Sequence, residues 1–288
     1  MQFNLIGPGR VGLALAQALI DTNQYSLLGI YHPTYARAEK AAKILAQGMA
    51  CHSLNQLPQA DVTFIATQDT HIKIIASELA ATKNLKPESL VAHLSGILSA
   101  DILMPLKTQD IHIGSLHPLK AFCHKETPEK NAFKHIDCAV EGDTFAVTQL
   151  SAIANALNAN VFEINPEQKA SYHAAAIMAS NYLVTLAAEA NALFESSGIP
   201  EKKAHALCTR LMQTSLDNLK QADIAKDALT GPLMRGDIES IQKHLNTIDS
   251  PITKALYQTA GLATLPLTNL NQPTRNIFKA LFTSKKVT

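Results

Sequence analysis

Lys169 and His173 stand four positions apart in the stretch KASYHAAAIMASN, and on a helix this spacing places them on one face. A lysine ammonium can polarise a carbonyl oxygen and donate a proton to the alkoxide that forms there. Asn181 follows two turns further along the same predicted helix. These three residues are therefore the candidates for catalysis, and the alternative is a surface lysine beside a half-buried histidine.

Three glycines follow the first apolar residues in QFNLIGPGRVGLALAQALI, between a predicted strand and a predicted helix. Gly7 would permit a tight turn, Gly9 a close approach of the backbone to a diphosphate, and Gly12 the packing of the helix on the sheet. A helix start also attracts anions. The pattern predicts a dinucleotide site rather than glycines that occur there by chance. The expected contacts are Gly7, Pro8, Gly9, Arg10, Val11 and Gly12.

The second predicted strand ends in GIYHPTYAR, with no acidic residue between Gly29 and Ala38. An acidic group there would take the ribose hydroxyls of NAD and repel a 2′-phosphate, so its absence favours NADP. His32, Thr34 and Arg37 are the candidate partners of that phosphate. Arg37 could instead be a solvated helix residue.

Later loops at the carboxyl ends of predicted strands supply further candidates. In ATQDTHI, Thr67 and Gln68 are expected to contact the cofactor, while Asp69 or Thr70 would cap the next helix. The stretches AHLSG, SLHPLKAF and VEGD follow at other strand ends. Ser95 and His117 are the residues we expect to line the substrate pocket, and Ser95 is also a candidate cofactor contact; either side chain could instead be a satisfied core polar group.

Short apolar strands alternate with helical segments up to about residue 165, which is typical of a parallel sheet covered on both faces. From residue 166 to 288 only helices are predicted. We therefore expect a nucleotide-binding domain over residues 1–165 and an all-helical domain over 166–288, with Lys169 at their junction. The Ala-rich helix near residues 168–196 has few charges and is expected to be buried in a homodimer.

The chain has 288 residues, of which 47% are hydrophobic and 17% charged, and this composition suffices for a sizeable core. Its net charge of +1 argues against nucleic acid or an anionic membrane as a partner. With neither a spanning stretch nor a charged leader in the sequence, we expect a cytoplasmic protein. The cysteines are scattered without a paired motif, which predicts reduced thiols. Two histidines five apart on a strand point to opposite faces, so no metal site is predicted. These residues are Cys51, Cys123, Cys138, Cys208, His112 and His117.

The order of these features resembles the superfamily of 3-hydroxyacid dehydrogenases, 6-phosphogluconate dehydrogenases and ketopantoate reductases. More closely, GPGRVG, HLSG, SLHPLKAF, KASYHAAAIMASNYL and LTGPLMRGD resemble a family of Rossmann-like proteins with an uncharacterised helical C-terminal domain. Some members of that family serve as an alternative type of ketopantoate reductase. The resemblance implies an α/β Rossmann domain with a parallel sheet, followed by a helical domain like the C-terminal domain of 6-phosphogluconate dehydrogenase.

In the main type of ketopantoate reductase, a catalytic lysine precedes an asparagine by four positions. Lys169 matches that lysine, whereas His173 stands in place of the asparagine and could orient the substrate, tune the lysine or act as the acid itself. The resemblance also implies substrate contacts on a later helix, with candidates at Thr230, Arg235 and Glu239 in DALTGPLMRGDIESI. A turn and helix cap at Gly231 and Pro232 is the alternative reading of that stretch.

We therefore expect an NADPH-dependent reductase of a small 2-oxo acid, with ketopantoate as the leading substrate and pantothenate biosynthesis as the setting. Lys169 would protonate the oxygen, and Arg235, with Thr230 or Asn181, would hold the carboxylate. Two alternatives stay open: a related dehydrogenase or imine reductase on the same scaffold, and a non-catalytic NADP-binding protein.

Overall fold

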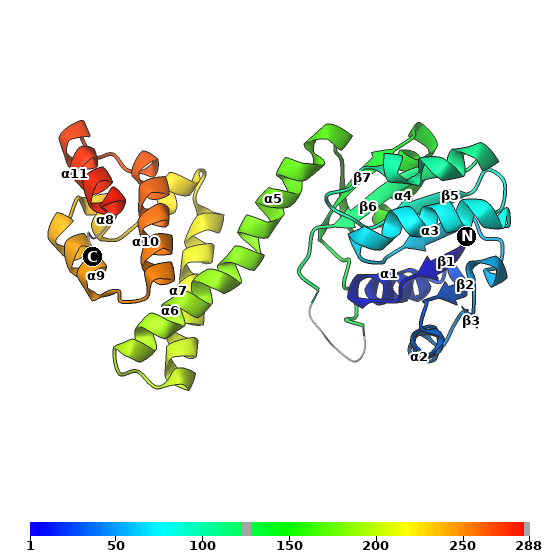
Figure 1. Cartoon of the computed structure of the whole chain (residues 1–288), viewed down its shortest axis with the longest axis horizontal. Coiled ribbons are helices and arrows are strands. Elements are labelled where there is room, and N and C mark those ends of the chain that lie inside the picture. The colour runs from blue at the N-terminus through cyan, green and yellow to red at the C-terminus, as the bar shows by residue number, and fades with distance from the viewer. Residues whose placement is uncertain (123–127, 285–288) are drawn as a thin grey trace. The chain divides into compact units, whose positions relative to one another are not determined.

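The computed structural model describes residues 1–122 and 128–284, and these residues form two compact units. The first unit, Met1–Ser180, carries the sheet, and the second, Asn181–Thr288, is helical (Figure 1). The division falls after Ser180, whereas the composition of the sequence changes near residue 165. The difference arises because Lys169 and Tyr172, in the intervening helix, bond to residues of the sheet.

One eight-stranded sheet forms the first unit, in the order β3-β2-β1-β4-β5-β6-β7-β8. Its strands are β1 (Gln2–Ile6), β2 (Ser26–Tyr31), β3 (Met49–Cys51), β4 (Val62–Ile65), β5 (Leu90–His93), β6 (His112–Pro118), β7 (Asp137–Gly142) and β8 (Asn160–Glu163). All neighbours are parallel except β6 and β7. The expected parallel sheet is thus confirmed from β3 to β6. β7 reverses because the described part of the 119–136 connection contains no crossover helix, which a parallel neighbour would need.

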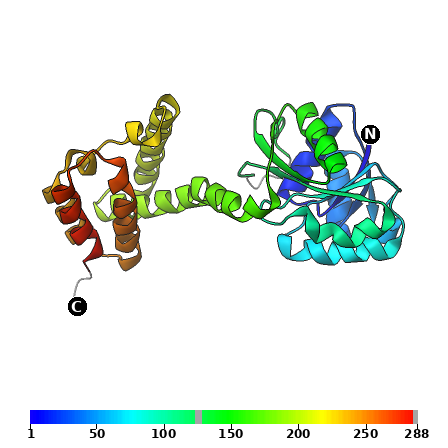
Figure 2. The same cartoon turned by 90° about the horizontal axis from the view of Figure 1, so that it is seen from above.

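Helices cover both faces of this sheet (Figure 2). They are α1 (Arg10–Asp21), α2 (Tyr35–Leu45), α3 (Asp69–Thr82) and α4 (Thr144–Ala156), with 3₁₀ segments η1 (Leu54–Gln56) and η2 (Ala100–Gln109). After β8 follow the 3₁₀ segment η3 (Pro166–Gln168) and α5 (Lys169–Ala179). Successive strand residues alternate between the two cores: Leu5 joins the cluster under α1 and α4, and Ile6 the cluster under α3 and η2. β1 is therefore packed on both faces, between β2 and β4, and the glycine turn begins at its carboxyl end.

The second unit consists of helices around a small core of its own. These are α6 (Asn181–Ser196), α7 (Glu201–Gln221), α8 (Pro232–Arg235), α9 (Ile238–Thr247), α10 (Pro251–Thr264) and α11 (Gln272–Thr283), with η4 (Ala225–Ala228) and η5 (Leu265–Leu267). Phe278 and Phe282 of α11 pack with Ile241 and Leu245 of α9 in that core. None of the described helices is long and apolar enough to cross a membrane.

The single long helix expected near residues 168–196 is wrong, because Ser180 separates α5 from α6. Ser180 has φ −121° and ψ −70°, which are not helical values, and its hydroxyl donates to the carbonyl of Ala176. Lys169 is the one buried residue of α5, and α6 has none. Apart from Lys169, neither helix is therefore buried within its own unit.

The three cysteines that the structure describes are free thiols, as the sequence predicted. Cys51, Cys138 and Cys208 are buried free thiols, and Cys123 lies outside the described residues.

Candidate functional site

The glycine turn at the end of β1 has the backbone that each glycine was expected to provide. Gly7 has φ +83°, a left-handed conformation, and a Cβ on Gly12 would lie 2.8 Å from the Gly7 carbonyl oxygen. Gly9 is different, because a Cβ there would meet no atom within 4 Å. Gly9 occupies the N-cap position of α1 and supplies no side-chain cap, so the first N–H groups of α1, those of Arg10 and Val11 among them, face an open position that suits an anion.

A buried polar atom without a partner lies beside this turn. The hydroxyl oxygen of Thr67 is buried and has no hydrogen-bond partner among the described residues, and the Thr67 methyl group lies against the Cβ position of Gly7. Buried hydroxyls are normally satisfied, so this one indicates that a ligand supplies the missing partner. The expected cap at Asp69 or Thr70 is wrong: α3 begins at Asp69, with Gln68 in the N-cap position and no side-chain cap.

At the end of β2, His32, Thr34 and Arg37 lie together as expected. The Thr34 N–H donates to His32 Nδ1 at 2.9 Å, and Thr34 immediately precedes α2. Burial, and then the charge of Arg37, lower the pKa of His32, so the guanidinium lies near that ring. Arg37 is exposed, and its side chain has no hydrogen-bond or ion-pair partner among the residues described. Arg10 donates to the carbonyl of Phe122 at 3.3 Å.

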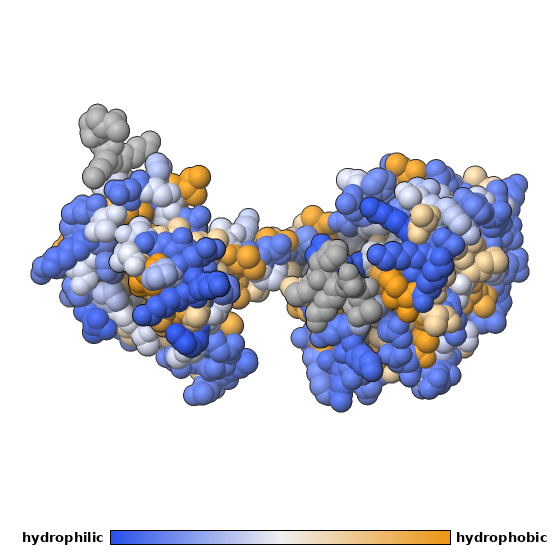
Figure 3. Space-filling view, turned by 90° about the horizontal axis from the view of Figure 1, so that it is seen from below, coloured by the Kyte–Doolittle hydropathy of each residue, from blue (hydrophilic) through white to orange (hydrophobic). Residues whose placement is uncertain are grey.

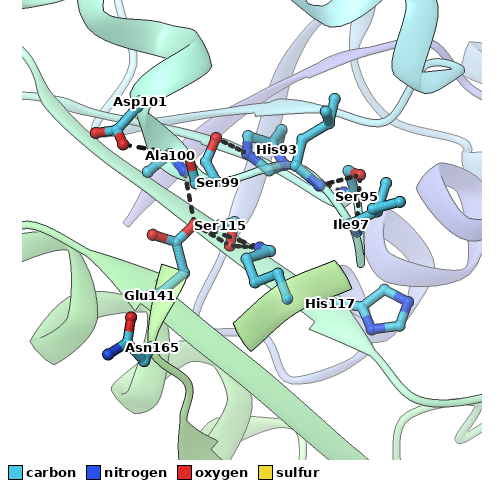
Figure 4. Close-up of polar contacts among 12 residues, drawn as sticks. His93, Ser95, Ile97, Ser99, Ala100, Asp101, Ser115, His117, Glu141 and Asn165 are labelled. Atoms are coloured by element: carbon cyan, nitrogen blue, oxygen red, sulfur yellow. Dashed lines mark hydrogen bonds and ion pairs between the residues drawn. The ribbon is translucent and has the colours of Figure 1, made fainter. Parts of the chain in front are cut away.

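Lys169 lies inside the protein and not at its surface. Its side chain is 1% exposed, and Nζ donates to Ser115 Oγ at 2.6 Å and to Glu141 Oε1 at 3.3 Å. Ser115 on β6 and Glu141 on β7 are paired across the antiparallel strands, and the Ser115 hydroxyl donates to Glu141 at 2.9 Å. The Ala100 N–H also donates to Glu141 (Figure 4). Burial lowers the pKa of Lys169, and Glu141 opposes that shift.

His93 and Ser95 shape the loop after β5. His93 is fully buried, accepting from the Ser95 N–H through Nδ1 at 3.2 Å and contacting the Ser99 carbonyl through Nε2 at 3.1 Å. Burial, with the charge of Lys169 nearby, lowers the pKa of His93 to about 3. The Ser95 hydroxyl accepts from the N–H groups of Ile97 and Leu98 (Figure 4). Ser95 is thus a loop-holding residue whose own O–H remains available as a donor.

His117, Tyr172 and His173 meet at Gly96. His117 Nδ1 lies 2.7 Å from the Tyr172 hydroxyl, and the rings of His117 and His173 have centroids 6.1 Å apart. A Cβ on Gly96 would come within 2.8 Å of both imidazoles. The sequence candidates His117 and His173 are therefore brought together, close to the loop that holds Ser95.

Ser115 and Tyr172 were not among the sequence candidates, and Glu141 was noted only as part of the strand-end stretch VEGD. Glu141 lies near the end of β7, which is antiparallel to β6, so the rule that sites gather at the carboxyl ends of parallel strands does not select it. Tyr172 gave a signal only through its place between Lys169 and His173 in the same helical turn.

Four sequence candidates lie in the second unit, and their roles stay predictions. Asn181 is the first residue of α6, and Arg235 is the last residue of α8. Gly231, at φ +92°, and Pro232 form the turn that starts α8, as the alternative interpretation of this stretch expected; Thr230 precedes that turn. Glu239 is exposed and pairs with Lys243 at 2.6 Å. Among the residues that the structure describes, no group of three or more His, Cys, Asp or Glu is placed to hold a metal.

Two protein-family profiles match consecutive parts of the chain, and the second begins within the first unit. Residues 1–118 match the profile of the Rossmann-like domain, and residues 136–264 match a domain of unknown function, DUF2520. A search of curated proteins found no match.

Solved structures share the fold over nearly the whole chain. BF3122 of Bacteroides fragilis, a provisionally assigned NADP oxidoreductase, is 23% identical with a TM-score of 0.76, covering 92% of this chain and 98% of its own. Protein TM1727 of Thermotoga maritima is 25% identical with a TM-score of 0.70, covering 92% and 97%. The imine reductase of Myxococcus stipitatus, solved with NADP⁺, is 18% identical with a TM-score of 0.64, covering 92% and 94%. The chain thus matches a Rossmann-like profile followed by a DUF2520 profile, and it shares its fold with these proteins.

Proposed function

We propose that the protein is an NADPH-dependent reductase of a small 2-oxo acid, with ketopantoate as the leading substrate. The observation that carries the proposal is the set of polar groups at the carboxyl ends of β1, β4, β5 and β6. The open anion position beside Gly9 follows β1, and the unpaired hydroxyl of Thr67 follows β4. The buried ammonium of Lys169 and the imidazoles of His117 and His173 lie near the ends of β5 and β6. The likeness to proteins whose names include NADP supports the choice of cofactor.

The residues present fit a dinucleotide phosphate. The N–H groups at the start of α1 would receive the diphosphate beside Gly9, and Thr67 would donate its unpaired hydroxyl. His32, Thr34 and Arg37 would hold the 2′-phosphate, and no carboxylate lies between Gly29 and Ala38 to repel it. When bound, the reduced nicotinamide supplies the hydride.

The second half of the reaction is a proton transfer to the substrate oxygen. Lys169 is the proposed donor: an ammonium has three N–H groups, two of which point to Ser115 and Glu141, and its lowered pKa makes it a readier acid. His173 is the second candidate, because it is less buried than Lys169 and faces Gly96. Arg235 stays the predicted partner of the carboxylate, since a guanidinium fork matches that group.

The test is a substrate panel read by NADPH oxidation. We expect turnover with ketopantoate or another small 2-oxo acid, and growth of a pantothenate-requiring bacterium that carries this gene. Turnover of cyclic imines but not of 2-oxo acids would instead establish the imine reductase alternative. Tight NADPH binding without oxidation by any substrate of either class would establish a non-catalytic binding protein.

A further inference from the structure

The first turn of α5 and the end of β6 meet through two side-chain pairs. Lys169 and Tyr172 are three apart and share a helix face, while Ser115 and His117 are two apart and share a strand face. Lys169 bonds to Ser115 at 2.6 Å, and the Tyr172 hydroxyl lies 2.7 Å from His117 Nδ1. The Lys169–Ser115 hydrogen bond thus fixes the position of α5 at which the Tyr172 hydroxyl contacts His117.

The other ring nitrogen of His117 is left for a different partner. Nε2 makes no hydrogen bond with any described residue, and it lies 2.7 Å from the position that a Cβ on Gly96 would take. Any side chain at position 96 would clash with this nitrogen and with the His173 ring. Nε2 therefore lies against Gly96 of the loop after β5, on a ring that is only partly buried.

We propose that Tyr172 is a positioning residue whose hydroxyl donates to Nδ1 of His117, which places the proton of the neutral imidazole on Nε2 and presents an N–H donor to the reacting oxygen of the carbonyl substrate. This role rests on the proposed function. It also implies a substrate whose reacting atom accepts a hydrogen bond before the hydride arrives.

The direction of the Tyr172–His117 hydrogen bond follows from the chemistry of the two groups. A phenol is a better donor than a neutral imidazole N–H, and an unprotonated imidazole nitrogen is a good acceptor. Burial raises the pKa of Tyr172 to about 12, so the phenol keeps its proton. Burial, with the charges of His173 and Lys169, lowers the pKa of His117 to about 4, so the ring is neutral at pH 7. The opposite direction would leave the phenol O–H without an acceptor among the described residues.

Nitrogen NMR of the histidine rings tests the inference without any turnover. In the ligand-free protein we expect His117 to show a protonated Nε2 and an unprotonated Nδ1, with its signals identified by their loss in His117→Gln. Tyr172→Phe keeps the ring and removes the hydroxyl, so the His117 signals should shift toward a mixture of tautomers. A protonated Nδ1 in the wild type, or unchanged His117 signals in Tyr172→Phe, would overturn the inference.

Kinetics supply the second readout, with a matched control. Tyr172→Phe should lower kcat by between about threefold and tenfold, the range of one neutral hydrogen bond, and leave the KM for NADPH unchanged. In a His117→Gln background, where an amide N–H replaces Nε2, the same change should have no further effect on kcat. Tyr257→Phe is the control, because Tyr257 makes an equivalent 2.8 Å hydrogen bond to His244 Nδ1 in the second unit; it should leave both kcat and the His117 signals unchanged.

The two proposals can fail separately. If no 2-oxo acid is reduced while the His117 signals behave as expected, the proposed function falls and the tautomer assignment stands. If 2-oxo acids are reduced and Tyr172→Phe retains wild-type kcat, the positioning role of Tyr172 falls.

Discussion

Lys169 and Glu141 form an ion pair in which both side chains are almost fully buried, at 1% and 3% exposure, with Nζ 3.3 Å from Oε1. The pair joins the first residue of α5 to β7, and Ser115 bridges the two groups. Breaking such a pair by removing one partner leaves a buried charge without compensation. A substitution at Lys169 therefore tests chemistry and stability together, and the two effects have to be separated.

Lys169→Ala should lower turnover on the order of 10²- to 10⁴-fold, as expected on loss of a positioned acid. It should also lower the free energy of unfolding by about 3 to 5 kcal/mol, because Glu141 is left unpaired. NADPH oxidation and urea unfolding measure the two losses, and cofactor affinity should barely change.

The double variant Lys169→Met with Glu141→Gln is the control for this experiment. Replacing both charges by neutral groups of similar size should restore most of the stability, because an apolar substitute for a buried ion pair is often neutral. Turnover should stay low. Recovery of turnover together with stability would show that Lys169 has only a structural role.

His173→Asn restores at that position the residue of the main ketopantoate reductase type, and we expect it to retain substantial kcat, because an amide can still orient a substrate. Steady-state kinetics with ketopantoate measure the effect. The reverse pattern, an inactive His173→Asn and an active Lys169→Ala, would make His173 the acid. Near-normal rates in both variants would remove α5 from the mechanism.

Gly9 separates cofactor binding from folding better than the other glycines of the turn. A Cβ at Gly9 meets no atom within 4 Å, so Gly9→Ala and Gly9→Asp should both keep wild-type stability. Gly9→Asp should abolish NADPH binding, because its carboxylate would occupy and repel the anion position of α1. Calorimetric titration checks the affinity, and thermal unfolding checks the fold. Full binding by Gly9→Asp would place the diphosphate elsewhere.

Arg37→Ala should weaken NADPH binding far more than NADH binding, because only NADPH carries the 2′-phosphate. Lys40→Ala, an exposed cation on the same helix, is the matched control and should affect neither cofactor strongly. Equal losses for both cofactors in Arg37→Ala would exclude its role at the phosphate.

The sequence predicted best what depends on neighbours along the chain. The glycine turn follows from local spacing, and the structure confirms the strand before Gly7 and the helix after Gly9. The Tyr172–His117 contact joins residues 55 positions apart, so no local pattern could reveal it. The antiparallel β7 depended on a connection without a crossover helix, and the break at Ser180 falls inside an Ala-rich stretch whose residue types give no sign of it. Lys169 was recognised by its type and spacing, but its burial depends on Ser115 and Glu141 from other strands.

His93 should make the protein sensitive to acid. Its pKa is about 3 in the folded protein and 6.5 when unperturbed, so between these values the unfolded chain binds a proton that the folded chain does not. The free energy of unfolding should therefore fall as pH drops below about 6.5, by up to about 1.4 kcal/mol per pH unit from this residue. Urea unfolding at several pH values measures the slope. His93→Gln, which keeps an N–H donor for Ser99, should reduce this slope and leave the contribution of His117, whose pKa is also lowered, whereas exposed His71→Gln should leave the slope unchanged.

The second unit leaves large apolar side chains exposed, and apolar surface is visible on it in Figure 3. Val184 on α6 is 70% exposed and Leu211 on α7 is 62% exposed, and few charges lie between Ala174 and Leu186. Because such a surface needs cover, we predict a homodimer formed through the helical unit. Light scattering should give about twice the 31.1 kDa chain mass at micromolar concentration. Val184→Lys should shift the protein to the monomer mass, whereas Ser196→Lys, at the end of the same helix, should not. A monomeric wild type would contradict the prediction.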